Sequence, residues 1–157
     1  MWLTRDAVLT DLERAGQLVE QRVSPDGMFG GWNGRDVLCH LAAYARLVGA
    51  LLRGEAEGRR PTSTELYGRE LREEELALGG LDEVNAAIQR ECVGLSYAEA
   101  LAFWRAMHAQ VVGQAARLTD EQLAAPGPAY PAIWSRPHVA EVVGALVAHY
   151  AGHMVLQ

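Results

Sequence analysis

The sequence predicts an all-α fold, a single four-helix bundle. Four long segments repeat apolar residues every three or four positions, which is the spacing of one face of a helix. No segment alternates apolar and polar residues as a half-buried strand would. At 157 residues and 50% hydrophobic composition, the chain is long enough to bury a core of its own. We therefore expect one helical domain over residues 1–157.

The first two predicted helices are separated by a short break. The first covers residues 5–22 and ends before the turn-forming segment Ser24-Pro25-Asp26-Gly27. The second begins at Asn33, a preferred N-cap residue, and runs to about Arg53, where we expect Gly54 to end it. The apolar stripes are Val8, Leu12, Ala15 and Val19 in the first helix, and Val37, Leu41, Tyr44, Val48 and Leu51 in the second.

The middle of the chain is its least regular part. Residues 54–80 are rich in glycine, glutamate and arginine, with a short helical piece expected near residues 63–78. After Gly79-Gly80, a helical run over residues 82–92 leads into the third long helix.

The third long helix is marked by a capping box. Ser96 is followed three positions later by Glu99, so that each side chain can bond a backbone N–H group of the other residue. Thr119 and Gln122 repeat the pattern and predict a short helical turn after this helix. The stripe of the third helix is Leu101, Trp104, His108, Val111, Ala115 and Leu118.

Prolines delay the fourth helix, which we expect to begin at about residue 135 with Ser135 as its N-cap. Trp134 precedes this cap as Trp32 precedes Asn33, so each indole is expected to pack on the first turn of its helix. The prolines are Pro126, Pro128 and Pro131, and the stripe of the helix is Val139, Val142, Leu146, His149 and His153.

The composition excludes several functions. The net charge is −6, which argues against a nucleic-acid partner because binding phosphates requires clustered cations. All 14 basic residues are arginine, so a Schiff-base lysine and a phosphate-loop lysine are excluded. We find neither a secretory leader nor a membrane-spanning stretch and expect a cytoplasmic protein with no membrane contact. Cys39 and Cys92 are expected to be buried free thiols.

Three histidines form the candidate metal site. His149 and His153 are four positions apart on the apolar stripe of the fourth helix, so both imidazoles point into the bundle and can bind one ion. His40, on the stripe edge of the second helix, is the natural third ligand. The alternative is that these histidines are hydrogen-bonded interior residues with no metal. Because His40 and His149 lie at different depths from their helix starts, the two helices cannot be parallel with level starts.

Five further residues are candidate neighbours or pocket residues of this site: Asp36, Tyr44, Trp104, His108 and Gln157. Asp36 is one turn before His40 and could orient its imidazole, although its position near the helix start also favours a capping role. His108 could approach the same cavity as a ligand or as a neighbour. Gln157 is four positions past His153 and faces the same way.

The ordered motifs resemble the DinB/YfiT-like superfamily over nearly the whole chain. The resemblance rests on Trp32-Asn33-x-x-Asp36-Val37-Leu38-Cys39-His40-Leu41, on Leu118 to Leu123, and on His149-x-x-x-His153-x-x-x-Gln157. It implies a DinB-type bundle with up-up-down-down topology and a long crossover between the second and third helices. It also implies a metal triad at His40, His149 and His153 and a homodimer.

The resemblance also suggests a chemistry. Bacillithiol S-transferases and the N-terminal domain of mycothiol-dependent maleylpyruvate isomerase are relatives that use a metal to deprotonate a low-molecular-weight thiol. We therefore expect one divalent metal, zinc first, with nickel, manganese or iron as alternatives, and a small-molecule or thiol substrate. The favoured function is a metal-dependent thiol S-transferase or hydrolase. The alternatives are a non-catalytic dimeric module that binds a small ligand or metal in stress response, and a purely structural metal bundle.

Overall fold

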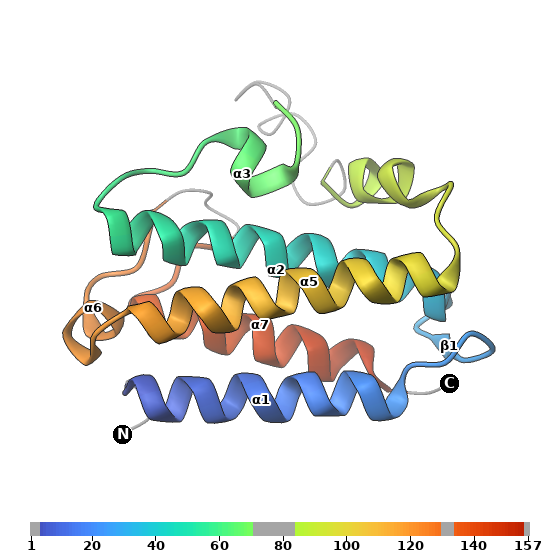
Figure 1. Ribbon diagram of the computed structural model, residues 1–157, viewed down its shortest axis with the longest axis horizontal. Helices are drawn as coiled ribbons and strands as arrows, with labels where there is room; N and C mark the ends of the chain where they lie inside the picture. Colours follow the sequence, from blue (N-terminus) through green and yellow to red (C-terminus); the bar gives the residue numbers. More distant parts are fainter. Residues whose placement is uncertain (1–3, 71–83, 130–133, 156–157) are drawn as a thin grey trace.

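A bundle of four long helices dominates the computed structural model, which describes residues 4–70, 84–129 and 134–155 (Figure 1). The long helices are α1 (Arg5–Arg22), α2 (Gly34–Glu57), α5 (Tyr97–Arg117) and α7 (Val139–His153). Two short helices, α3 (Ser63–Tyr67) and α6 (Asp120–Ala124), lie in the connections, and residues 84–92 are also helical. The predicted all-α four-helix bundle is therefore confirmed.

The helix directions follow the order up-down-down-up, and the expected up-up-down-down order is wrong. In Figure 1, α1 and α7 run one way while α2 and α5 run the other way. An ion pair between Glu20, near the end of α1, and Arg105, in the first half of α5, agrees with this arrangement. The short connection after α1 turns the chain back beside it. The expected long crossover then returns the chain to the same end of the bundle, which makes α2 and α5 parallel.

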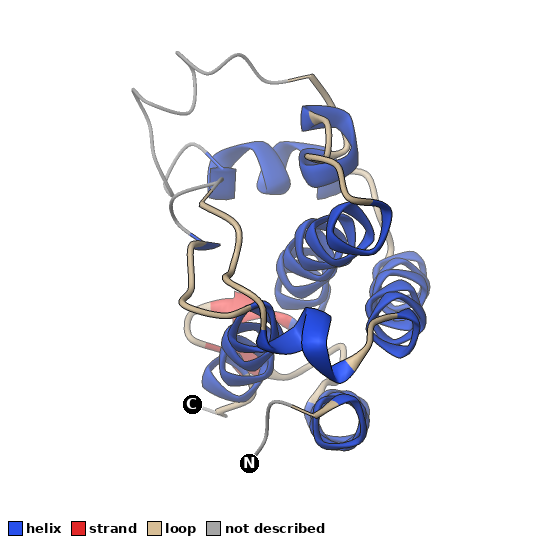
Figure 2. Cartoon of the chain, turned by 90° about the vertical axis from the view of Figure 1, so that its left-hand side faces the viewer, coloured by secondary structure: helices blue, strands red, loops and turns tan. Residues whose placement is uncertain are grey.

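A two-residue hairpin makes the turn between α1 and α2. β1 (Met28–Phe29) pairs antiparallel with β2 (Trp32–Asn33), and the hairpin lies at the far end of the bundle in Figure 2. Gly30 and Gly31 have φ angles of 62° and 85°, which a tight two-residue hairpin turn requires. The expectation of no strand is wrong here, because strands this short carry no alternating pattern.

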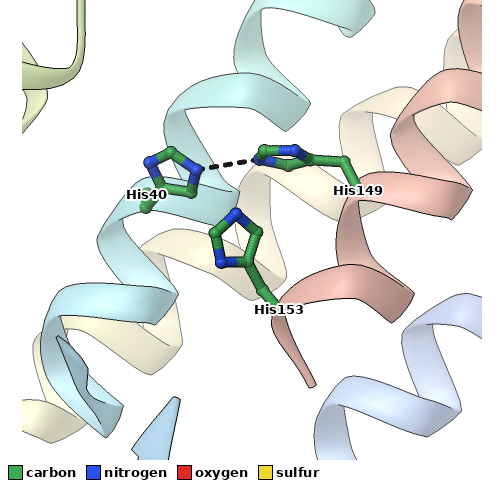
Figure 3. A group of neighbouring side chains, drawn as sticks. All are labelled: His40, His149 and His153. Carbon is green, nitrogen blue, oxygen red and sulfur yellow. Dashed lines mark hydrogen bonds between the residues drawn. The ribbon is translucent and has the colours of Figure 1, made fainter. Parts of the chain in front are cut away.

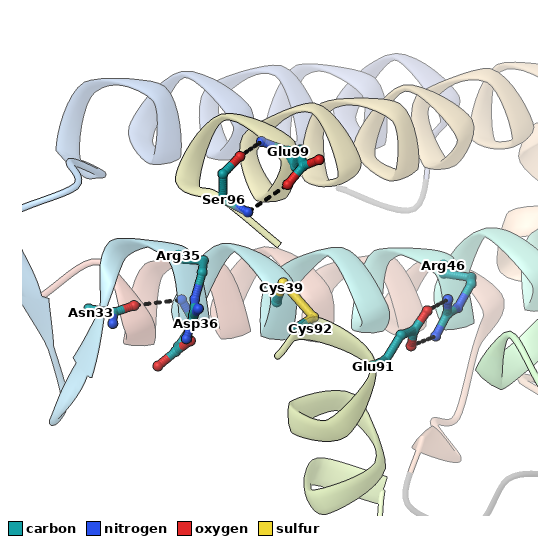
Figure 4. Close-up of a disulfide and its surroundings, with 9 residues drawn as sticks. All are labelled: Asn33, Arg35, Asp36, Cys39, Arg46, Glu91, Cys92, Ser96 and Glu99. Carbon is teal, nitrogen blue, oxygen red and sulfur yellow. Dashed lines mark hydrogen bonds and ion pairs between the residues drawn. A yellow bond between two sulfur atoms is a disulfide. The ribbon is translucent and has the colours of Figure 1, made fainter. Parts of the chain in front are cut away.

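α2 begins as predicted and ends later than predicted. The side chain of Asn33 accepts the backbone N–H of Asp36 at 2.9 Å, which caps the helix (Figure 4). The helix continues past Gly54 to Gly58, whose φ of 65° is the left-handed conformation of a helix end. Gly54 serves packing instead, because a Cβ there would meet the carbonyl oxygen of Arg59 at 2.5 Å.

α2 is the core helix of the bundle. Its length and composition would let it cross a membrane, but 89% of its most apolar 18-residue window is buried inside the protein. Burial of this kind is typical of the central helix of a packed domain. It places the residues of α2, His40 among them, deep in the interior.

The crossover lies on the side of α2 that faces away from α1 (Figure 1). α3 falls inside the expected range 63–78, and helical residues 84–92 agree with the described part of the expected run over residues 82–92. Cys39 on α2 and Cys92 form a disulfide, with their Cα atoms 6.2 Å apart (Figure 4). The expectation of two free thiols is wrong, because the crossover brings together cysteines that are 53 positions apart.

Both predicted capping boxes are confirmed. At the start of α5, the backbone N–H of Glu99 donates to the hydroxyl of Ser96, and the Glu99 carboxylate accepts the Ser96 N–H (Figure 4). Thr119 and Gln122 make the same reciprocal pair at the start of α6.

The fourth long helix begins later than expected, and the N-cap is His138 instead of Ser135. Pro137 disfavours the helical conformation of the residue before it, which keeps the preceding segment extended. The backbone N–H of His138 donates to the carboxylate of Glu141 at 2.9 Å. The N–H of Val139 donates to the carbonyl of Ala125 at 3.0 Å, so this helix start is also tied to the end of α6.

Candidate metal centre

The antiparallel arrangement of α2 and α7 brings three histidines together (Figure 3). His40 comes from the first half of α2, and His149 and His153 come from the last turns of α7. Each offers a ring nitrogen to a group of ligand atoms that all lie within 4.8 Å of one another. This arrangement satisfies the depth constraint that the sequence imposed, because the start of one helix meets the end of the other.

The imidazoles of His40 and His149 face each other directly. Their Nε2 atoms are 2.9 Å apart, and the ring of His153 lies 4.6 Å from each of the other two rings between centroids. The side chain of His40 is almost wholly enclosed, at 3% exposure, and its Nδ1 atom is buried with no hydrogen-bond partner among the described residues. Burying a polar atom without a partner costs free energy, so its presence calls for an explanation, and a role in a functional site is one.

Burial keeps the three histidines neutral. Desolvation, followed by the nearby charges of His149 and His153, lowers the pKa of His40 to about 2. Desolvation and the charge of His153 lower the pKa of His149 to about 4, and desolvation alone lowers the pKa of His153. All three imidazoles are therefore unprotonated at neutral pH, which is the state that a metal ligand must have.

Aromatic rings wall the histidine cluster. Trp32 packs edge-on against His40 with centroids 4.5 Å apart and stacks on His153 at 5.8 Å. Tyr44 lies 4.8 Å from His40 and 4.7 Å from His149. The hydroxyl of Tyr44 donates to Asn85 Oδ1 at 3.0 Å, and burial raises its pKa to about 12, so it is a neutral donor.

A cavity of about 530 Å³ opens beside the cluster. This volume is typical of a small-molecule site. Among the described residues that line this cavity, Arg136 is the one with a formally charged side chain, and none is a carboxylate. The lining residues are Trp32, His40, Tyr44, Asn85, Trp134, Arg136, Ala145, Ala148, His149 and His153.

Of the other residues predicted to lie near the histidines, some line the cavity and others do not. Tyr44 is in the cavity wall, as expected of a pocket residue. The carboxylate of Asp36 bonds the guanidinium of Arg35 at 2.8 Å (Figure 4), so it does not orient His40. Asp36 lies in the first turn of α2, where the helix dipole favours a carboxylate. Gln157 lies outside the described residues.

Trp104 and His108 belong to a different cluster. Their rings stack at 5.2 Å between centroids, and His108 Nδ1 is 3.2 Å from the hydroxyl of Tyr150. Both side chains line a groove on α5 beside Gly16 of α1. They are on the face of α5 directed toward α1 and α7, so the structure does not bring them to the histidine cavity.

Six cavity residues were not identified as site residues from the sequence: Trp32, Asn85, Trp134, Arg136, Ala145 and Ala148. The repeated tryptophan before each helix start was a usable signal, read only as a packing feature of the helix ends. Asn85 comes from the crossover, and nothing in its local sequence indicates where that segment packs.

The donor set suits a divalent transition metal. Neutral imidazoles are ligands that zinc, nickel, iron and copper all accept. Two ligands about 2.1 Å from a tetrahedral ion lie roughly 3.4 Å apart, whereas the three ligand atoms lie within 4.8 Å of one another, so binding one ion would require the rings to move closer together. The residues therefore fit a three-histidine centre beside the cavity.

Comparison with known proteins supports one family. The model of the DinB superfamily matches residues 4–155. No curated protein and no solved structure gives a significant match to the chain.

Proposed function

The chain belongs to the DinB superfamily, and we propose that it is a metal-dependent enzyme that transfers a small thiol to an electrophile. The observation that carries this proposal is the junction of the three-histidine cluster with the cavity of about 530 Å³. A structural metal site is closed by four protein ligands, whereas a catalytic site keeps a position open. Three histidines beside a cavity follow the second pattern.

The size of the cavity favours a thiol over water as the activated group. A hydrolase that activates only a water molecule needs little more room than its substrate requires, whereas a transferase accommodates both a thiol and its acceptor. A volume of about 530 Å³ is in the range of sites for drug-sized molecules. A divalent cation held by His40, His149 and His153 would supply Lewis acidity, which lowers the pKa of a thiol at its open position.

The residues around the cluster bind and orient the substrate. Trp32, Tyr44 and Trp134 offer apolar faces to its carbon skeleton. The hydroxyl of Tyr44 keeps its proton at neutral pH and donates it in a hydrogen bond to Asn85. Tyr44 therefore does not act as the base that accepts the proton of the thiol. Because no carboxylate among the described residues lines the cavity, that proton leaves to solvent.

We further propose zinc as the metal, a homodimer as the assembly and the cytoplasm as the location. Zinc is the most common ion for imidazole sites of this kind. The dimer follows from the family resemblance, and light scattering of the purified chain measures it directly.

Metal content and thiol transfer together test the proposed function. Elemental analysis of the purified protein is expected to find about one divalent metal per chain. His149→Ala and His153→Ala are expected to lose it, because each removes one of three ligands. The control is His138→Ala, which removes a partly exposed histidine at the start of α7, away from the cluster. The protein is then assayed with a panel of small thiols and monochlorobimane.

The outcomes separate the metal from the chemistry. Equal metal content in the wild type and the two cluster variants would rule out the site. Metal in the wild type without metal-dependent conjugation of any thiol would rule out the transferase and leave a metal-binding module.

A further inference from the structure

The described residues that line the histidine cavity carry positive formal charge and no negative formal charge. Among the described lining residues, Arg136 is the one with a formal charge at neutral pH, and the histidines are neutral. A divalent cation at the cluster would add two more positive charges with no carboxylate ligand to offset them. Positive charge in a cavity with apolar walls attracts anions strongly, because the low dielectric weakens screening.

The indole ring of Trp134 lies between Arg136 and the histidine cluster. Its guanidinium carbon lies 5.7 Å from the centre of the Trp134 ring, and Trp134 in turn lies 6.3 Å from the ring of His149. The extended segment before Pro137 holds Arg136 there, outside the helix. A molecule with its reacting atom at the histidines and a second group at Arg136 would therefore lie along the face of Trp134.

The guanidinium of Arg136 has donors to spare. Nη1 donates to the carbonyl of Ser135 at 2.8 Å, and no carboxylate among the described residues pairs with this side chain. This sets it apart from Arg46, Arg59 and Arg105, which each pair with a glutamate. An arginine that stacks on an aromatic ring and keeps free donors is suited to bind a carboxylate.

We propose that Arg136 recognises a carboxylate on the thiol substrate, so that the protein selects anionic thiols over neutral ones. This inference rests on the proposed function and specifies its substrate class. The sulfur end of the substrate lies at the histidines, its carbon skeleton lies against Trp134, and its carboxylate pairs with Arg136. The same pairing fixes the orientation of the thiol before reaction.

Thiol binding to the cobalt-loaded protein tests the inference without an activity assay. Coordination of sulfur to cobalt gives a near-ultraviolet absorption band, which is titrated with matched thiols. One pair is N-acetylcysteine and its neutral amide, and a longer pair is N-acetylglutathione and its neutral diethyl ester. The wild type is expected to bind the anionic member of at least one pair about tenfold more tightly or better.

Three variants complete the design. Arg136→Gln is expected to remove the preference, and Arg136→Lys is expected to keep part of it because the charge remains. The control is Arg117→Gln, an exposed arginine at the end of α5 that bonds Gln114, and it is expected to keep the full preference. Circular dichroism of each variant confirms that the helices are intact.

The outcomes distinguish this inference from the proposed function. Equal affinity of the wild type for both members of both pairs, or a preference that survives Arg136→Gln, would overturn the role of Arg136 while leaving thiol binding intact. Absence of the absorption band with every thiol would overturn the proposed function itself, and the inference with it.

Discussion

The Nε2 atoms of His40 and His149 lie 2.9 Å apart, although 109 positions separate the two residues in the chain. Both rings are neutral, so one nitrogen donates and the other accepts. To bind a cation through both atoms, the ring whose Nε2 carries the proton would have to move that proton to its Nδ1, and the ion would then replace this hydrogen bond. Protonation of these histidines is therefore expected to lower the free energy of unfolding of the metal-free protein. A bound metal ion is expected to raise the free energy of unfolding at neutral pH.

Acid is expected to destabilise the metal-free protein in a defined range. The unfolded chain protonates its histidines near pH 6.5, whereas the native pKa values of His149 and His40 are lowered to about 4 and about 2. Between these values the unfolded state binds more protons, so the free energy of unfolding falls as pH falls. Each histidine contributes a slope of about 1.4 kcal/mol per pH unit.

Urea denaturation between pH 8 and pH 4, with a chelator present, measures this slope. His149→Gln is expected to show a shallower decline between pH 6.5 and pH 4 than the wild type. A wild type and a His149→Gln variant with the same pH dependence would show that burial does not depress the pKa of this histidine.

Metal is expected to stabilise the fold through the cluster. An ion that binds only the native state at about 100 times its dissociation constant adds about 2.7 kcal/mol. For a domain of this size, that gain corresponds to a rise of roughly 5–10 °C in the melting temperature. Differential scanning calorimetry with added zinc is expected to show the rise in the wild type and not in His153→Ala. The same rise in both proteins would place the stabilising ion elsewhere.

The disulfide is expected to contribute substantially to stability. Cys39 and Cys92 close a long loop, and removal of such a cross-link costs about 2–4 kcal/mol. The double variant Cys39→Ala/Cys92→Ala is therefore expected to unfold at lower urea than the oxidised wild type. The wild type treated with a reductant should also lose stability.

Alkylation followed by intact mass measurement provides the check on the bond. Under denaturing, non-reducing conditions neither cysteine of the oxidised protein is expected to react, and both should react after reduction. Two modified cysteines before reduction would mean that the thiols are free. The bond joins the residue next to His40 to the helical segment that carries Asn85, so its loss also loosens one wall of the cavity.

Two glycine substitutions are expected to have opposite effects. Gly34 opens α2 where it packs against the preceding turn, and an added Cβ would overlap the carbonyl oxygen of Ser24. Gly34→Ala is expected to cost about 1–3 kcal/mol, as overpacking does, and to displace the helix that carries His40. Gly113, inside α5, has open space around it, so Gly113→Ala is expected to gain up to about 1 kcal/mol. Thermal unfolding ranks the two variants against the wild type, and a stable Gly34→Ala would contradict the tight contact.

The local features of the fold were predictable from the sequence. Asn33, Ser96 and Thr119 cap helices as predicted because a cap depends on a few neighbouring residues. His149 and His153 face inward because their four-residue spacing follows the apolar stripe of α7. The helix order and the disulfide were not predicted, because both depend on where the crossover packs. The start of α7 was placed too early because the effect of Pro137 outweighed the capping tendency of Ser135.

The site was only partly predictable for the same reason. The three histidines could be proposed together from helix spacing and the family pattern, but their neighbours come from three separate segments. Trp104 and His108 share a stripe that continues toward α1 and α7, and only the rotation of α5 decides which cavity they reach. Asn85 and Arg136 lie in connections, where helical spacing gives no information about direction.

The most direct test of the account is anomalous diffraction from crystals of the protein grown with a divalent metal, measured at the absorption edge of that metal. One strong anomalous peak is expected among the imidazoles of His40, His149 and His153, with ring nitrogens at about 2.0–2.1 Å for zinc. An open coordination position facing the cavity beside Trp134 is also expected. Crystals with no peak between these histidines, or with the metal bound only elsewhere, would contradict the proposed centre.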